Sequence, residues 1–264
     1  MLQHRTEIVP SGNILDKVKA SLPSGSAVAI TCLPHHPIER TMSTALQLAD
    51  EGYQAIPHLA ARSVESRAQV SKILRYCEAA GIGDIFVVGG DAQHPAGPYD
   101  SALPLLEDIR EMAGGTMKLG AAGYPEGHPS VRPPRLLEAL VAKQETASYV
   151  VTQMCFSAPK IIDYIAIIRR EGVGLPVLAG VAGAVPRTKL ISLASKIGVG
   201  TSLKFLSRQG PLARRLLIGD SYSPATLISD LASVPDAVTG IHLYSFNNIS
   251  PAFTSPAMHQ STSQ

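Results

Sequence analysis

Three features are scarce in this sequence: cysteine, net charge and long apolar runs. The 264 residues include three cysteines, which lack CxxC spacing. An odd number without that spacing argues against a disulfide scaffold and for a reducing compartment. Lysine and arginine exceed aspartate and glutamate by only 23 to 21, a net charge of +2. So small an excess argues against a nucleic-acid-binding surface.

Segments that could enter a membrane are scarce as well. The first residues, MLQHRTEIVPSG, contain no apolar stretch of the kind that a secretory signal peptide needs. No run of about 18 uncharged apolar residues occurs in the sequence, so no transmembrane helix is expected. We therefore expect a cytoplasmic protein that binds neither nucleic acid nor a membrane.

The sequence is rich enough in apolar residues to build a large core. Apolar residues make up 45% of the chain and charged residues 17%, which argues against a disordered protein. The length suits one (β/α)₈ barrel, which typically takes about 250 residues. We expect a single barrel domain over residues 1–250 and a polar tail over 251–264.

Short apolar runs alternate with amphipathic segments along the chain. Strands are expected at residues 6–9, 26–34, 53–59, 84–90, 117–125, 148–156, 175–183 and 239–246. Helices are expected at 13–22, 37–52, 63–81 with Ser63 as N-cap, 101–113, 135–146, 158–172 and 186–198, and two more within 201–238.

Eight such units indicate a parallel α/β sheet that closes into a (β/α)₈ TIM barrel. An open doubly wound sheet is the alternative. It is disfavoured because no glycine-rich phosphate-binding motif follows any of the strands.

Polar side chains gather where the expected strands end. A barrel of this kind carries its active site at the carboxyl ends of the strands, so these positions are candidates for chemistry. They are Glu7, Thr31, Cys32, His58, Asp91, Tyr124, Gln153, Gly180, Val181, Tyr244 and Asn247.

Several motifs at these positions match one family. AGYPEGHP (122–129) is the most specific, and IPHLAARS around His58, VVTQMCF around Gln153 and IHLYSFNN near the end support it. TEIVPSG and VVGGDAQHP fit the same pattern. From about Glu7 to Asn247 the sequence resembles the methylenetetrahydrofolate reductase family, the flavin-dependent (β/α)₈ enzymes of one-carbon metabolism.

This resemblance implies roles for individual residues. Glu7 corresponds to the general acid at N5 of the folate, and Asp91 to a catalytic aspartate beside the flavin and the pterin. Gln153, Tyr244 and Asn247, with Asp91, correspond to the folate site. The FAD site would comprise Thr31, His58, Gly89, Gly90, Tyr124, His128, Arg132, Arg135 and Lys143.

The expected reaction requires a carboxylic acid and an amide of this kind, whatever the family. Reducing 5,10-methylenetetrahydrofolate to 5-methyltetrahydrofolate requires opening a ring to an iminium, and a partly desolvated carboxylic acid can supply the proton. A carboxylate and a primary amide can read the edge of a pterin. The resemblance further implies NAD(P)H as a possible electron donor and a homo-oligomer.

The chain departs from the family pattern at the flavin site. Gly89 stands where the family has an arginine before Gly-Asp, Arg135 and Glu138 stand at an acid and an amide position, and Asn248 replaces an arginine. Two alternatives stay open: a paralogue that oxidises 5-methyltetrahydrofolate with an acceptor such as oxygen, and a flavin-free folate protein, either an NAD(P)H-dependent reductase or a non-catalytic carrier.

Metal and thiol chemistry are not expected. His35, His36, His58, His94 and His128 show no HxH or HExxH spacing, so no metal site is predicted. Cys32 and Cys155 have no adjacent cation in the sequence to activate a thiolate, and a buried, inert role suits them better.

Overall fold

The structure, a computed structural model, describes residues 2–34, 36–186 and 221–249. Eight parallel strands form a closed barrel in the order β1-β10-β7-β6-β5-β4-β3-β2. The predicted (β/α)₈ fold is therefore confirmed. The strands are β1 (Gln3–Ile8), β2 (Ala27–Ile30), β3 (Gln54–Ala60), β4 (Asp84–Val88), β5 (Lys118–Gly123), β6 (Tyr149–Thr152), β7 (Val177–Ala182) and β10 (Gly240–Tyr244).

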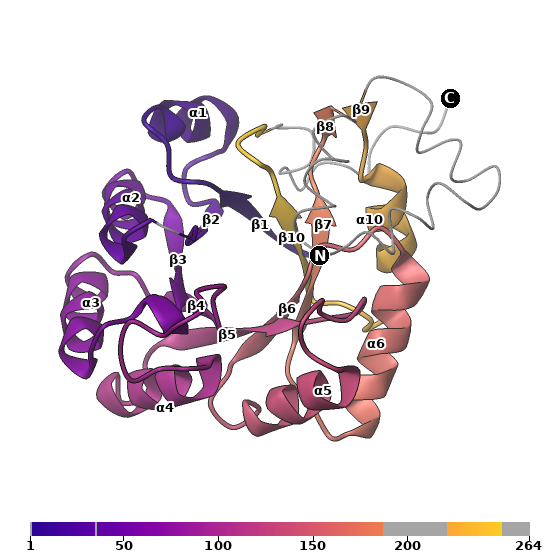
Figure 1. The fold of residues 1–264 in the computed structure, drawn as a ribbon. Helices are drawn as coiled ribbons and strands as arrows, with labels where there is room; N and C mark the ends of the chain where they lie inside the picture. The colour runs from indigo at the N-terminus through magenta and orange to yellow at the C-terminus, as the bar shows by residue number, and fades with distance from the viewer. Residues whose placement is uncertain (1, 35, 187–220, 250–264) are drawn as a thin grey trace.

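Seven α-helices lie in the described part of the chain. Figure 1 shows α1 to α4 along one side of the barrel and α5, α6 and α10 along the other. Their amphipathic faces supply the apolar layer between helices and strands. They are α1 (Ile14–Ser21), α2 (Ile38–Asp50), α3 (Arg67–Ala79), α4 (Ala102–Met112), α5 (Pro133–Ala142), α6 (Ala158–Arg170) and α10 (Ala225–Ala232).

Two helix starts differ from the prediction. The N-cap of α3 is Ser66, whose Oγ accepts a hydrogen bond from the Gln69 amide, and not Ser63. Ser63 instead ends a short 3₁₀ turn, η1 (Ala61–Ser63), that follows β3 directly. Helix α5 begins two residues early because prolines at its first two positions have φ angles that suit a first turn.

The end of the chain is described only in part. A two-stranded antiparallel pair, β8 (Val185–Pro186) and β9 (Ser221–Tyr222), leads into α10 and the last barrel strand. The helix predicted at 186–198, part of the stretch 201–238 and the tail at 251–264 lie outside the described residues.

The barrel lumen is filled by side chains of alternate strand residues. Its apolar layer consists of Ala29, Ile56, Phe86, Tyr149, Val151 and Leu178, all at most 6% exposed. Gly120 on β5 makes this packing possible, since a Cβ there would lie 2.5 Å from the Tyr149 ring and 2.6 Å from Phe86. The lumen is thus a packed core, with polar groups only towards its two ends.

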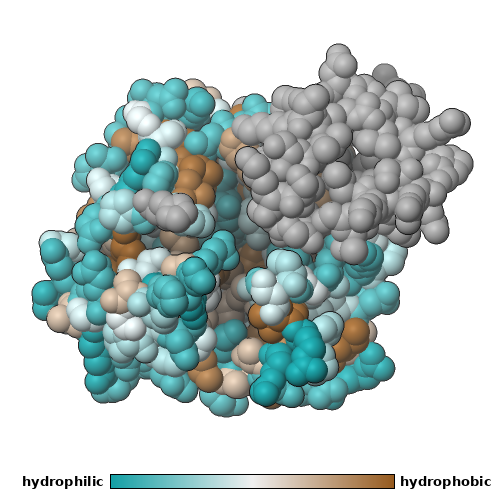
Figure 2. Space-filling model, in the orientation of Figure 1, coloured by the Kyte–Doolittle hydropathy of each residue, from teal (hydrophilic) through white to brown (hydrophobic). Residues whose placement is uncertain are grey.

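The outer surface is mostly hydrophilic. Figure 2 shows hydrophobic residues in small, separate patches on the described surface of this view. Among the described residues, none of the helices combines the length and the apolar character needed to span a bilayer.

Candidate active site

Glu7 lies near the carboxyl end of β1, beside the strands that carry two other candidates. In the sheet register it stands opposite Tyr244 of β10 and Ala29 of β2. Its side chain is 16% exposed and enters the lumen. The closed barrel therefore brings together residues that are more than 200 positions apart in the sequence.

Two histidines surround the Glu7 carboxyl group. His242 Nε2 lies 3.0 Å from Glu7 Oε2, within hydrogen-bond distance, and His58 Nδ1 lies 3.9 Å from the same oxygen. The two histidine side chains are 2% and 5% exposed. Burial lowers the pKa of His58 to about 4, although Glu7 acts in the opposite direction. His58 is therefore neutral near pH 7.

This trio has donor atoms that a metal ion could use. The three atoms lie within 4.8 Å of one another. A metal-bound histidine almost always donates its other ring N–H to a partner. Here His58 Nε2 and His242 Nδ1 are buried without any hydrogen-bond partner. The arrangement fits a hydrogen-bonded acid better than a metal centre.

Tyr244 reaches across β7 to the next strand. Its hydroxyl donates to the Thr152 carbonyl at 3.1 Å. Gly180 lies beneath this crossing, and a Cβ there would come within 2.8 Å of the tyrosine ring and 2.1 Å of the Thr152 oxygen. Burial raises the pKa of Tyr244 well above its usual value, with a further contribution from Glu7. The phenol is therefore neutral and held in place at the mouth.

Gln153 follows β6 and is oriented by the 122–129 motif. Its Oε1 accepts a hydrogen bond from the Glu126 amide at 2.9 Å, so the amide NH₂ points elsewhere. Among the described residues, the NH₂ group donates to no protein acceptor. The Glu126 side chain is fully buried, where Cys155 Sγ donates to it at 3.0 Å and Lys160 Nζ lies 3.8 Å away. This arrangement presents Gln153 as a hydrogen-bond donor.

Asp91 sits in an exposed loop after β4 that Arg62 holds in place. The Arg62 guanidinium donates to three main-chain carbonyls of this loop, those of Ala92 (2.6 Å), Gln93 (2.6 Å) and Asp100 (2.9 Å). Gly90 has a φ of +88°, and a Cβ there would lie 3.0 Å from Ala60, so the turn requires glycine. Arg62 of η1 thus fixes the backbone of the loop that carries Asp91.

Four further residues predicted for the flavin side lie near the strand ends. Tyr124 packs edge-on against His128 at 5.4 Å, and His128 Nδ1 accepts from the Ser130 amide. Burial raises the pKa of Tyr124, with a smaller contribution from Asp91. Thr31 follows β2 and its amide donates to Ile8. His58 completes the set within the lumen.

Cys32 neighbours Thr31 but is not activated. Burial raises the pKa of its thiol to about 12, with Glu7 adding to the shift. Cys155 is buried and donates to Glu126. Both observations agree with the expectation that neither cysteine acts as a nucleophile.

The three cations predicted for the FAD site lie at the two ends of α5. Arg132 is the exposed N-cap of α5, and Arg135 pairs with Glu138 on the surface at 3.2 Å. Lys143 is the C-cap, ten residues after the helix begins, which is about 15 Å along its axis. The Arg135 amide donates to the Arg132 carbonyl at 3.0 Å, so the two arginines share the first turn of α5, whereas Lys143 lies at its other end.

Asn247 closes the seam of the barrel. Its Oδ1 accepts from the Val9 amide at 2.7 Å and its Nδ2 donates to the Val9 carbonyl at 2.8 Å. It adopts a φ of +61°, which asparagine tolerates. The side chain thus extends the β1–β10 pairing, and its predicted contact with the folate stays a prediction.

His242 and Arg62 were not found from the sequence. His242 stands two residues before Tyr244, so strand alternation places both on the lumen face, and this signal could have identified it. Arg62 carries no comparable signal. Its three acceptors lie 30 to 38 residues away in a loop without regular structure.

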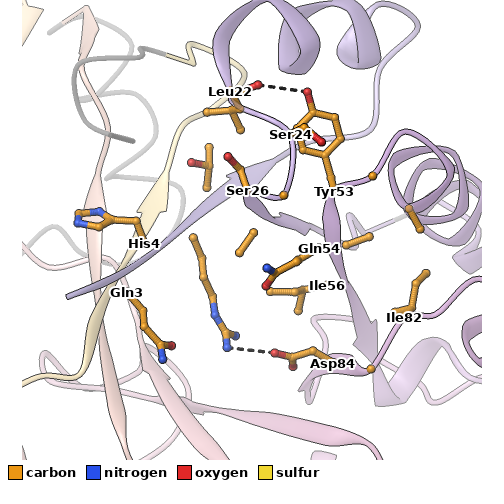
Figure 3. Close-up of a pocket in the computed structure, with 18 of the residues that line it drawn as sticks. Gln3, His4, Leu22, Ser24, Ser26, Tyr53, Gln54, Ile56, Ile82 and Asp84 are labelled. Carbon is orange, nitrogen blue, oxygen red and sulfur yellow. Dashed lines mark hydrogen bonds and ion pairs between the residues drawn. The ribbon is translucent and has the colours of Figure 1, made fainter. Parts of the chain in front are cut away.

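A separate cavity of about 930 Å³ lies at the opposite end of the barrel. It is lined by the first residues of several strands, among them Gln3, Gln54, Asp84 and Lys118. Figure 3 shows Asp84 joined to Arg5 by an ion pair at the edge of this cavity. None of the predicted site residues lines it, since they gather at the carboxyl ends.

Comparison with known proteins agrees with the motifs. The family model described as methylenetetrahydrofolate reductase matches residues 13–252. A probable methylenetetrahydrofolate reductase (NADPH) from Caenorhabditis elegans is 30% identical over 122 residues, 44% of this chain and 18% of that protein. Methylenetetrahydrofolate reductase 2 from Saccharomyces cerevisiae is 25% identical over 144 residues, 50% of this chain and 24% of that protein. The matches thus span less than a quarter of each relative.

Solved structures resemble the chain in fold only. A putative phosphonomutase from Burkholderia cenocepacia has a TM-score of 0.54 at 12% identity, over 92% of this chain and 87% of that one. An oxaloacetate acetylhydrolase has a TM-score of 0.56 at 13% identity, over 96% of this chain and 78% of that one. At such identities the likeness extends to the barrel and no further.

Proposed function

Because the chain belongs to the methylenetetrahydrofolate reductase family, we propose that it reduces 5,10-methylenetetrahydrofolate to 5-methyltetrahydrofolate. One observation carries the proposal: the half-buried Glu7 carboxyl group lies at the mouth of the barrel and hydrogen bonds to His242. It forms no ion pair with a lysine or arginine of the described residues. A carboxyl group without a cationic partner is suited to hold a proton for transfer.

Glu7 supplies the proton that ring opening requires. The bond between the bridging carbon and N10 breaks, N10 takes the proton, and the iminium carbon that stays on N5 accepts a hydride. The proton of this step therefore goes to N10, whereas the resemblance implied N5. The cost of proton transfer is lowered because the carboxylate that results accepts a hydrogen bond from a buried donor. His58 and Tyr244 lie near the carboxyl group and are neutral near pH 7, so neither forms an ion pair with the carboxylate.

The pterin is held by Gln153 and Asp91. Glu126 fixes the Gln153 oxygen, so the NH₂ group offers donors to acceptors on the pterin edge. Asp91 offers an acceptor from the loop that Arg62 orders. The donor follows β6 and the acceptor follows β4, the two strands that flank β5, and together they set the orientation of the ring, which is a large part of catalysis.

Thr31, His58, Gly90 and Tyr124 would hold a flavin at the strand ends. Such a group would supply hydride transfer, with NAD(P)H as the electron source. Lys143 lies at the opposite end of α5 from Arg132 and Arg135, so we propose that only the isoalloxazine half would be held in the family manner. A homo-oligomeric state and a cytoplasmic location stay predictions, and light scattering tests the first.

The test is reduction of 5,10-methylenetetrahydrofolate by the purified protein, with the visible spectrum recorded on the same sample. We expect a yellow protein that forms 5-methyltetrahydrofolate when NAD(P)H is present, and a Glu7→Gln control that keeps the spectrum but loses turnover. A colourless protein that is nevertheless active with NAD(P)H contradicts the flavin part alone. Absence of turnover in either direction, with the folate bound or not, contradicts the proposed reaction.

A further inference from the structure

We propose that His242 is the positioning residue of the acid: its Nε2–H donates to Glu7 Oε2 and leaves Oε1 as the oxygen that carries the transferable proton. The hydrogen bond itself is independent of any reaction. Its catalytic meaning rests on the proposed role of Glu7. Sequence motifs did not single out this histidine. It lies on β10, two residues before Tyr244 and thus deeper in the lumen.

The first step of the argument is geometry. His242 Nε2 lies 3.0 Å from Glu7 Oε2, and the histidine side chain is 2% exposed. Its ring packs against Tyr244 at 4.9 Å, with His58 at 6.1 Å and Phe86 at 6.4 Å between ring centroids. Three rings therefore restrict rotation of the imidazole and keep Nε2 directed at the carboxyl group.

The second step is the position of the ring proton. His242 Nδ1 is buried and has no hydrogen-bond partner. A proton on Nδ1 would leave a buried donor unsatisfied, whereas a proton on Nε2 meets the Glu7 oxygen directly. The Nε2–H form also serves both states of Glu7, because Oε2 accepts whether Oε1 is protonated or not.

The third step excludes other donors to the same carboxyl group. His58 Nδ1 is 3.9 Å away, beyond hydrogen-bond distance. The Tyr244 hydroxyl donates to the Thr152 carbonyl instead. The Cys32 thiol interacts with Glu7 only through charge. Within the described ranges, His242 is thus the side chain that holds the Glu7 carboxyl group by a hydrogen bond.

The chemical consequence concerns which oxygen acts. With Oε2 occupied as an acceptor, protonation takes place at Oε1, and loss of that proton leaves a carboxylate that the Nε2–H stabilises. A histidine in this place therefore lowers the cost of the conjugate base at the moment when it forms.

The direct test is a long-range ¹H–¹⁵N correlation spectrum of the native protein labelled with ¹⁵N-histidine. We expect a neutral His242 ring with its proton on Nε2, assigned by its loss in His242→Phe. Its signal should shift in Glu7→Gln, while that of His4, at the other end of β1, stays in place. A proton on Nδ1, or on both nitrogens, overturns the proposal. This readout needs no turnover, so it is separate from failure of the proposed reaction.

The functional test compares two replacements. His242→Phe keeps a ring but has no donor, and His242→Gln places an amide N–H near the position of Nε2. We expect kcat to fall about 10- to 100-fold in the phenylalanine variant and to recover to within about threefold in the glutamine variant. The folate KM should stay nearly constant in both, because the pterin contacts are elsewhere.

Two controls keep the outcome interpretable. His4→Phe makes the same chemical change at the other end of the barrel and should leave kcat unchanged. Thermal unfolding of each variant reports on packing, and rescue by glutamine is not expected from packing alone. Equal loss in the two His242 variants, or no loss in His242→Phe, overturns the proposal. Should His242→Phe fail to fold, the spectrum of the native protein still decides it.

Discussion

The two ends of the barrel lumen each hold a largely buried carboxyl group, and the protein treats them in opposite ways. At the amino ends of the strands, Asp84 pairs with Arg5 at 3.0 Å and accepts the Tyr149 hydroxyl at 2.7 Å. Arg5 also lies over the Tyr149 ring, 4.2 Å from its centroid. Burial raises the pKa of Asp84, although Arg5 opposes the shift. The negative charge at this end is matched by a positive one.

At the carboxyl ends, Glu7 meets two imidazoles and a phenol but no such cation among the described residues. We infer from this difference that the Arg5–Asp84 pair has a structural role and that Glu7 has a chemical one. Arg5 and Tyr149 hold the Asp84 carboxyl group at the amino ends of the strands, whereas the Glu7 carboxyl group meets His242 near the carboxyl ends, where the predicted site residues lie. Breaking each end in turn should therefore give opposite results for activity and stability.

The largest effect on kcat is expected at the carboxyl ends of the strands, where Glu7 lies. Glu7→Gln keeps the shape and the hydrogen-bond acceptor but removes the transferable proton, so kcat should fall about 10²- to 10⁴-fold. Folate binding, measured by equilibrium dialysis, should change little. Turnover near the native rate would mean that Glu7 is not the acid.

The corresponding experiment at the amino ends of the strands removes the ion pair between Asp84 and Arg5. Asp84→Asn leaves Arg5 buried without its partner, which should lower the free energy of unfolding by about 3 kcal/mol. The kcat of the folded variant should stay at the native value. Urea unfolding measures the first quantity, and Arg5→Met/Asp84→Leu is the matched control that removes both charges and should recover most of the loss. If Asp84→Asn lowered kcat and left the free energy of unfolding unchanged, the structural role of Asp84 would be contradicted.

A smaller effect, of about 2 kcal/mol in the free energy of unfolding, is expected from the pH dependence of His58. The pKa of His58 is lowered to about 4 by burial, below the ordinary value of 6.5. Between these values the unfolded chain binds a proton that the folded protein does not, so stability falls as the pH drops from 6.5 towards 4. From pH 6.5 to 5 the loss should be about 2 kcal/mol.

His58→Phe is the comparison for this pH effect, since it keeps a ring and removes the titrating group. The free energy of unfolding of the native protein, minus that of the variant, should fall by about 2 kcal/mol from pH 6.5 to pH 5. A difference that stays constant over this range would contradict the assignment. His4, whose pKa burial also lowers, is present in both proteins and cancels.

The smallest effect is expected for substrate contact. Gln153→Ala removes the donor that Glu126 orients, and the folate Kd should rise about tenfold, equivalent to about 1.4 kcal/mol. The native kcat should be largely kept. Gln144→Ala is the matched control, because Gln144 also accepts a main-chain hydrogen bond, from Gly174 at 2.7 Å, but at the far end of the barrel. Equal effects in the two variants would rule out a specific folate contact.

The regular part of this fold could be predicted because periodicity reports burial directly. Strand alternation and helical spacing gave the eight barrel strands and the described helices within a few residues. The start of α3 was missed because Ser63 and Ser66 are both good caps, and the intervening 3₁₀ turn decides between them. Local sequence does not reveal such a turn.

The candidate site was predictable where a residue ends a strand and not where a long side chain crosses the structure. Glu7, His58 and Tyr244 meet as expected since closure of the barrel brings strand ends together. Arg62 escaped notice because its role depends on where a distant loop folds. The bonds of Asn247 to Val9 were not foreseen, because they depend on the first and last strands lying side by side in the closed barrel.

The apolar layer between the two ends has a consequence for proton supply. Ile56, Phe86, Val151 and Leu178 are nearly sealed from solvent and separate the Arg5–Asp84 pair from the mouth. No water-filled route from below is compatible with such packing. On the proposed mechanism, Glu7 must then be recharged through the mouth, the same opening that the folate enters and leaves. Each catalytic cycle would consume one stored proton, replaced after the product has departed.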